Sequence, residues 1–207
     1  MADGQDYLSI QPIFEGFPLY QILPASKFVR EQLRGIPQFT YGGTRHHTAD
    51  LYIPEDDVDA YALVDLLRYI QHCELPFDDD YDKFSTPQMT GYFTTAAITK
   101  DIKFMCETYQ AYMVLGMHEG QLAQQEQLVE NIKAYFSSDR LTSADAVLHF
   151  WRTCKEDAVL TWRVLWQVLT CVTKCSLDLE QAFGRCFEQE VEMRHLWEVL
   201  LEHKKKL

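Results

Sequence analysis

The stretch LYIPEDDVDAYALVDLLRYIQ, residues 51–71, decides how the rest of the chain is interpreted. A short apolar run ends at Pro54, which has no backbone donor for a sheet. Apolar residues then recur at three- and four-residue steps from residue 58, the pattern of an amphipathic helix. Asp56 and Asp57 stand between the two runs, where a carboxylate can accept the free N–H groups of a first helical turn. We therefore interpret these acids as a structural helix cap and not as catalytic groups.

The N-terminal side of this stretch predicts short β-elements and one short helix. The runs at residues 6–14 and 16–23 are β-like and are separated by a plausible turn. Residues 25–33, ASKFVREQL, have helical spacing. Residues 48–54, TADLYIP, are expected to form the strand that ends at the proline.

The C-terminal side is predicted to be mostly helical. The connection at residues 72–99 carries an acidic run, which we interpret as a solvated loop because it lacks the ligand spacing of a calcium loop. A helical hairpin is expected over residues 101–137, and Gly116 is a natural stop for its first helix. Beyond residue 140 we expect three more helices. The one at 159–174 is apolar nearly all round and should be buried, and the last should run over 179–203.

Composition excludes several functional classes. The 207 residues include 19 basic and 31 acidic ones, for a net charge of -12. Because phosphates and anionic lipids need a basic surface, we expect no direct nucleic-acid binding and no membrane docking. No signal peptide is visible and no run is long and apolar enough to span a membrane. We therefore expect a nuclear or cytoplasmic protein with reduced cysteines.

The sequence shows no motif of a catalytic, cofactor or metal site. The serine-nucleophile elbow, the P-loop, the dinucleotide-binding glycine pattern and H-E-x-x-H do not occur. His46 and His47 are adjacent, so on a strand they would point to opposite faces and make poor co-ligands. The six cysteines lack the spacing of a zinc site. We therefore predict no catalytic residue, no cofactor and no bound metal, and we expect no enzymatic activity.

Four tryptophans, at positions 151, 162, 166 and 197, all fall after residue 140. Such residues most often form the core between helices, but they can also line a ligand pocket. An alternative function is therefore a small-molecule-binding or enzymatic helical domain that uses this tryptophan-rich segment.

The order of these elements, with the residues that carry them, resembles the BTB/POZ domain. The strongest match is TADLYIPEDDVDAYALVDLLRYIQHCELPF. ETYQAYMVLGMHEGQLAQQEQLVENI is similar to the helical hairpin of that family. ASKFVREQL is similar to its S-x-x-F helix, with Ser26 in place and Val29 where the aromatic residue usually stands. The resemblance covers roughly residues 6–137 and is closest to divergent fungal members, which carry a helical segment after the domain.

The resemblance implies an α+β, mostly helical chain. A BTB/POZ-like domain, with a small β-sheet flanked by helices and a helical hairpin, would occupy residues 1–139. A C-terminal helical extension of about three helices would occupy residues 140–207. The implied function is a non-catalytic protein–protein interaction module, acting as an adaptor or scaffold. The resemblance does not decide whether the chain forms a homodimer. In many members an extra N-terminal helix supports dimerisation, and no such helix is expected before the first strand here.

Two narrower functions follow from the resemblance. Some members bind a cullin and serve as substrate adaptors of ubiquitin ligases, often through a hydrophobic-x-Glu motif at the start of the first hairpin helix. Met105 and Glu107 match that position and are the candidate partner-binding residues, although an ordinary amphipathic helix would carry the same pair. The other function is a transcription or chromatin cofactor that a nuclear complex brings to DNA, because the net charge offers no direct DNA-binding surface.

Overall fold

Helices make up most of the chain that the structure describes. The computed structural model describes residues 17, 22, 26–34, 51, 53, 57–74, 88–89, 101–117, 123–137, 143–175, 183–185, 187 and 190–206. The helices are α2 (Lys27–Gln32), α3 (Ala60–His72), α5 (Ile102–Val114), α6 (Ala123–Ser137), α7 (Ala144–Cys154), α8 (Ala158–Cys175) and α10 (Val191–Lys205). The helices predicted within residues 25–33, 58–71 and 101–137 are thus confirmed, as α2, as α3 and as the pair α5 and α6.

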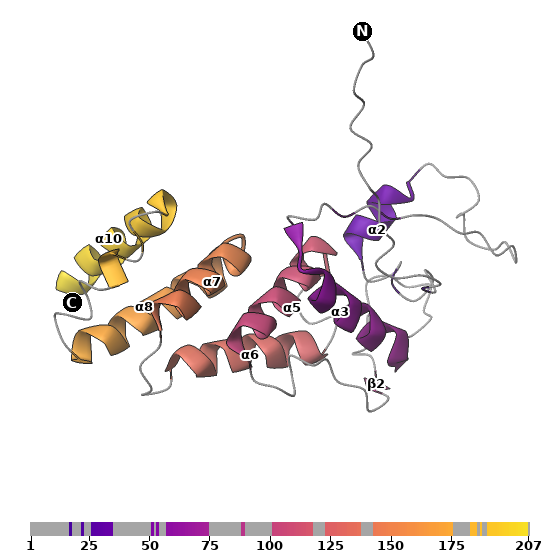
Figure 1. Cartoon of the computed structure of the whole chain (residues 1–207), viewed down its shortest axis with the longest axis horizontal. Helices are drawn as coiled ribbons and strands as arrows, with labels where there is room; N and C mark the ends of the chain where they lie inside the picture. Colours follow the sequence, from indigo (N-terminus) through magenta and orange to yellow (C-terminus); the bar gives the residue numbers. More distant parts are fainter. Residues whose placement is uncertain are drawn as a thin grey trace, which may run out of the picture.

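Helix α5 is the centre of the first half of the chain. It packs against α3, α6 and α7, and Figure 1 shows these three helices around it. A helix with neighbours on several sides has to be apolar over most of its circumference. Its buried side chains are Ile102, Met105, Cys106, Thr108, Tyr109, Ala111 and Tyr112.

Helix α8 is the centre of the second half and packs against α6, α7 and α10. One stripe along it is buried, formed by Leu160, Thr161, Val164, Leu165, Val168 and Leu169. Residues two positions further along are rotated by about 200° on an α-helix. Trp162 and Arg163 stand there and are exposed. The expected burial of this helix on all sides is therefore wrong, because its neighbours cover one face and leave the opposite face partly open.

The end of α5 is fastened to the start of α2. The N–H of Gly116 donates to Met113 O (2.9 Å), and the N–H of Met117 donates to Tyr112 O (3.1 Å). These two bonds form a Schellman motif, which needs a left-handed residue after the helix, and Gly116 has φ 60°. The predicted helix stop at Gly116 is confirmed. The hydroxyl of buried Ser26, the N-cap of α2, donates to the carbonyl of Leu115.

The predicted fold class is wrong for the described residues. Their strands are β1 (Cys73–Glu74) and β2 (Gln88–Met89), an antiparallel pair with Cys73 opposite Met89. This two-residue ladder is not the sheet that a BTB/POZ-like α+β fold requires. Leu51 and Ile53 were expected in a strand, but neither is in one. Both are half-buried and pack against the helical core. Most of the other residues expected in strands lie outside the described part of the chain.

The helices on both sides of residue 140 share contacts. The buried apolar side chains form one cluster that reaches from Ile22 to Leu200. Tyr109 of α5 donates its hydroxyl to Oδ2 of Asp157 (2.6 Å). Oδ1 of the same aspartate accepts the N–H groups of Val159 (3.0 Å) and Leu160 (2.9 Å), so Asp157 caps α8. The boundary at 139/140 stays a prediction, and α5 and α7 pack directly across it.

The expected helix over residues 179–203 is interrupted. Residues 183–185 are helical, but Glu190 has a non-helical backbone (φ -108°, ψ 90°), and α10 begins at Val191. Arg152 of α7 forms an ion pair with Glu190 (Nε to Oε1, 2.8 Å). Lys155 forms a second one with Glu192 (Nζ to Oε2, 3.6 Å). These pairs tie the start of α10 to the end of α7.

Replacement of Gly116 by alanine is expected to lower the free energy of unfolding by about 1–2 kcal/mol, because a left-handed backbone is strained for any residue with a Cβ. The new Cβ would also lie 3.2 Å from the Cβ of Lys27 and 3.2 Å from the backbone nitrogen of Phe28. Urea unfolding measures the change. Gly184→Ala is the matched control, because nothing lies within 4 Å of its added Cβ. Equal effects of the two variants would contradict the proposed role of Gly116.

Replacement of Asp157 by alanine is expected to cost about 1–3 kcal/mol, since both the cap of α8 and the bond from Tyr109 are lost. Tyr109→Phe removes the hydroxyl that bonds Asp157 but keeps the cap of α8, so it should cost less. Chemical denaturation followed by circular dichroism and by tryptophan fluorescence should give one coincident transition for the wild type. Two separate transitions would mean that the helices before and after residue 140 unfold independently.

Candidate functional site

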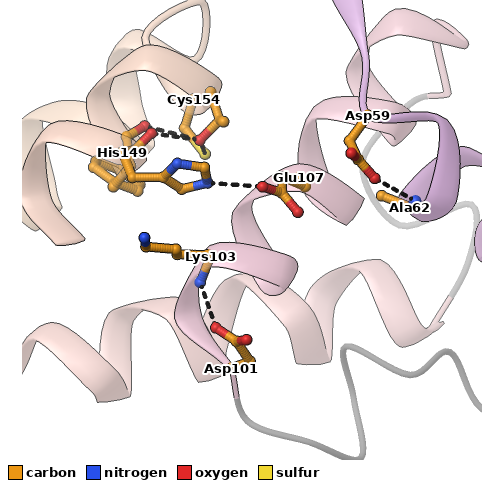
Figure 2. A network of polar contacts seen from close by, with 9 residues as sticks. Asp59, Ala62, Asp101, Lys103, Glu107, His149 and Cys154 are labelled. Carbon is orange, nitrogen blue, oxygen red and sulfur yellow. Dashed lines mark hydrogen bonds and ion pairs between the residues drawn. The ribbon is translucent and has the colours of Figure 1, made fainter. Parts of the chain in front are cut away.

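Helices α5 and α7 face each other through a polar cluster. Figure 2 shows the imidazole of His149, on α7, pointing toward Glu107 on α5. The Nε2 atom of His149 lies 3.3 Å from Oε1 of Glu107, and the two side chains are 25% and 26% exposed. Nε2 is buried and has no hydrogen-bond partner among the described residues. The contact is therefore a close approach without the geometry of a hydrogen bond.

Burial dominates the electrostatics of this pair. It lowers the pKa of His149, and the charges of Lys103 and Arg152 lower it further, while a backbone hydrogen bond with Lys103 and the charge of Asp101 act in the opposite direction. Burial also raises the pKa of Glu107, as do the charges of Asp59 and Asp101. Both pKa shifts favour the neutral form. The pair is thus a half-buried polar contact between helices and not a strong ion pair.

The two candidate partner-binding residues lie in different environments. Met105 is 2% exposed and belongs to the core, so it is not on a face that a partner could touch in this structure. Glu107 is half-buried against α7. Between them, Cys106 is fully buried, and burial together with a hydrogen bond to Cys154 raises the pKa of its thiol. The hydrophobic-x-Glu pattern therefore lies at a helix–helix contact.

The acids of the opening stretch are placed as follows. Asp56 lies outside the described residues, and Asp57 is exposed in a single turn before the helix. The carboxylate that caps α3 belongs to Asp59, whose Oδ1 accepts the N–H of Ala62 (2.9 Å). The sequence signal for it was present, because Asp59 directly precedes Ala60 and an N-cap bonds the amide three residues later.

A surface groove of about 670 Å³ lies between α6 and α8. Its lining residues are Lys133 and Ser137 from α6 and Trp162, Arg163, Trp166, Gln167, Thr170 and Cys171 from α8. On α8 these positions follow the stripe opposite the buried one, so the groove exists because α8 turns one face away from the core. The tryptophan-rich segment predicted a pocket only as an alternative, and the position of the groove could not be predicted, because it depends on which neighbours cover α8.

The four tryptophans divide into two environments. Trp151 and Trp197 are buried in the core, and the ring of Trp197 packs against Phe183 and Phe187. Trp162 is 38% exposed and Trp166 is half-buried, and both line the groove. The ring of His203, on α10, lies 5.5 Å from Trp166 and 6.5 Å from Trp162 between ring centroids. α10 thereby supports the two groove tryptophans.

Within the described part of the chain, no group of three or more histidine, cysteine, aspartate or glutamate side chains could hold a metal ion. Cys106, Cys154 and Cys171 are free thiols. None of the described helices has the length and apolarity that crossing a membrane requires.

Comparisons with protein-family models, with curated proteins and with solved structures each found no match to this chain. The resemblance to the BTB/POZ domain stays a prediction.

Replacement of His149 by glutamine is expected to reduce the loss of stability on acidification. The folded pKa of His149 lies below its ordinary value of about 6.5, so the unfolded chain binds the proton first as pH falls. The free energy of unfolding that neutral His149 contributes is fully present above its ordinary pKa, and it is lost as pH falls toward and through the lowered pKa of the folded chain. Wild type should therefore lose more free energy of unfolding than His149→Gln between about pH 7.5 and about pH 5.5.

Glu107→Gln is the control for this titration. The raised pKa of Glu107 stabilises the folded state as pH falls, so its removal should make the loss on acidification steeper than in the wild type. Urea unfolding at the two pH values measures both variants. Identical pH profiles for wild type and His149→Gln would show that His149 does not titrate differently in the folded and unfolded chains.

Proposed function

We propose that this chain is a non-catalytic protein-interaction module, an adaptor or scaffold, and that it binds a partner protein in the groove between α6 and α8. The observation that supports this is the pair Trp162 and Trp166, whose rings lie in a surface hollow instead of in the core. Exposed aromatic surface costs free energy in water, so a partner that covers these two rings would gain binding free energy from their burial.

The residue types in the groove support a protein partner. Tryptophan and arginine are the residues most enriched at the energetic centres of protein interfaces, and Trp162, Trp166 and Arg163 supply both types here. The groove stripe on α8 runs from Trp162 to Cys171, a length of about 14 Å at the rise of an α-helix. That length matches about four residues of an extended segment.

The volume of about 670 Å³ also falls in the range of small-molecule sites. Such sites bury most of their ligand, whereas this groove lies open at the surface between two helices, which favours a segment of a protein. No observation on the described residues favours the cullin adaptor or the nuclear cofactor, and both stay predictions. Cullin pull-down with wild type and Glu107→Lys tests the first of them, with thermal unfolding to check that the variant is folded; Met105→Asp would place a charge in the core and is not a binding test.

Trp162→Ala is expected to abolish or strongly weaken partner binding while the fold is kept. Affinity purification from native extract with quantitative mass spectrometry compares proteins captured by wild type and variant. Val159→Ala is the matched control, because Val159 is also on α8, is 63% exposed and does not line the groove. Thermal unfolding checks that both variants are folded. A partner set unchanged by Trp162→Ala would rule out the groove as the binding surface.

A further inference from the structure

We propose that the occupant of the α6–α8 groove is an acidic segment of a partner protein in which large apolar side chains stand next to carboxylates. This inference rests on the proposed function and adds the chemistry of the partner. Three observations carry it: the charge of the lining residues, the absence of a partner for Arg163 among the described residues, and the arrangement of side chains along α8.

The charge of the groove is opposite to that of the chain. The whole sequence has a net charge of -12. Among the described residues that line the groove, the charged side chains are Lys133 and Arg163, and neither aspartate nor glutamate is present. A hollow with two cations on a strongly acidic chain is complementary to carboxylates and not to basic segments.

Arg163 is available to a ligand. It is exposed, and it makes no hydrogen bond or ion pair with any described residue. A guanidinium can hold a carboxylate through two parallel N–H···O bonds, which gives both strength and orientation. Lys133 is paired with Glu130 at 2.8 Å, but Glu130 is 67% exposed. Such a surface pair contributes little, so a ligand carboxylate can replace it.

The lining residues of α8 form two parallel rows. Trp162 and Trp166 are four residues apart and stand above one another on the helix, and Arg163 and Gln167 form the adjacent row. Gln167 makes no hydrogen bond with the described residues, so its amide can donate to a ligand. An apolar row beside a donor row fits a segment that presents apolar side chains along one edge and carboxylates along the other.

The test uses three fluorescein-labelled synthetic peptides and fluorescence anisotropy. In the first, phenylalanine and leucine stand between aspartate and glutamate. In the second peptide, asparagine and glutamine, which have the same size but no charge, replace aspartate and glutamate. In the third peptide, lysine replaces aspartate and glutamate. We expect saturable binding of the acidic peptide to the full chain, binding of the amide peptide that is about tenfold weaker or more, and no binding of the basic one.

Two variants locate the contact. Arg163→Glu should weaken binding of the acidic peptide by about tenfold or more and should make binding of the basic peptide detectable. Arg194→Glu is the charge-matched control on α10, because Arg194 is exposed and does not line the groove.

Alkylation of Cys171 provides an independent readout, because this side chain is half-buried in the groove. The bound acidic peptide should slow the modification of Cys171 by N-ethylmaleimide, which mass spectrometry follows.

Each other outcome overturns the inference. Equal binding of the acidic and amide peptides, lost in Trp162→Ala, would refute the acidic partner and leave the proposed function standing. Absence of peptide binding, with partner capture unaffected by Trp162→Ala, would refute both. Displacement of the acidic peptide by phenylacetate at equal concentration would assign the groove to a small aromatic acid. A dimer in light scattering that Trp162→Ala dissociates would assign the groove to a second copy of the chain.

Discussion

The packing of α5 on three sides is the constraint on which the first half of the structure depends. A helix that contacts α3, α6 and α7 has little surface left for polar groups. Glu107 and His149 are therefore half-buried at the contact with α7, and burial shifts the pKa of each toward its neutral form. The same packing places Met105 in the core. A surface role for the hydrophobic-x-Glu pair would require α7 to move away from α5.

Helix α8, unlike α5, has one face that its neighbours leave partly open, and the groove lies along this face. α6, α7 and α10 cover α8 but leave the face of Trp162 and Trp166 partly open. Asp157 fixes the start of α8 through both of its carboxylate oxygens, one to the helix and one to Tyr109 of α5. The orientation of the groove face is thus set by a bond to the central helix of the other half.

The sequence predicts local structure here better than it predicts sites. The periodicity of residues 58–71 and the glycine after residue 115 define two helices, because both signals are local. The short apolar run around Leu51 and Ile53, which ends at Pro54, predicted a strand, but the burial of these two residues depends on helices distant in sequence. The division of the tryptophans into Trp151 and Trp197 inside and Trp162 and Trp166 in the groove depends on tertiary contacts alone. All four stand in similar apolar helical surroundings in the sequence.

The charge of the chain bears on how an acidic segment would bind. A net charge of -12 repels an acidic partner at distances up to the Debye length, about 10 Å at moderate ionic strength. Association is therefore not accelerated by long-range attraction, unlike that of oppositely charged proteins. Only within the groove, where Arg163 and two indole rings meet the ligand, does the interaction become favourable. Affinity must then come from slow dissociation, which favours partners that fill the apolar row over acidic chains in general.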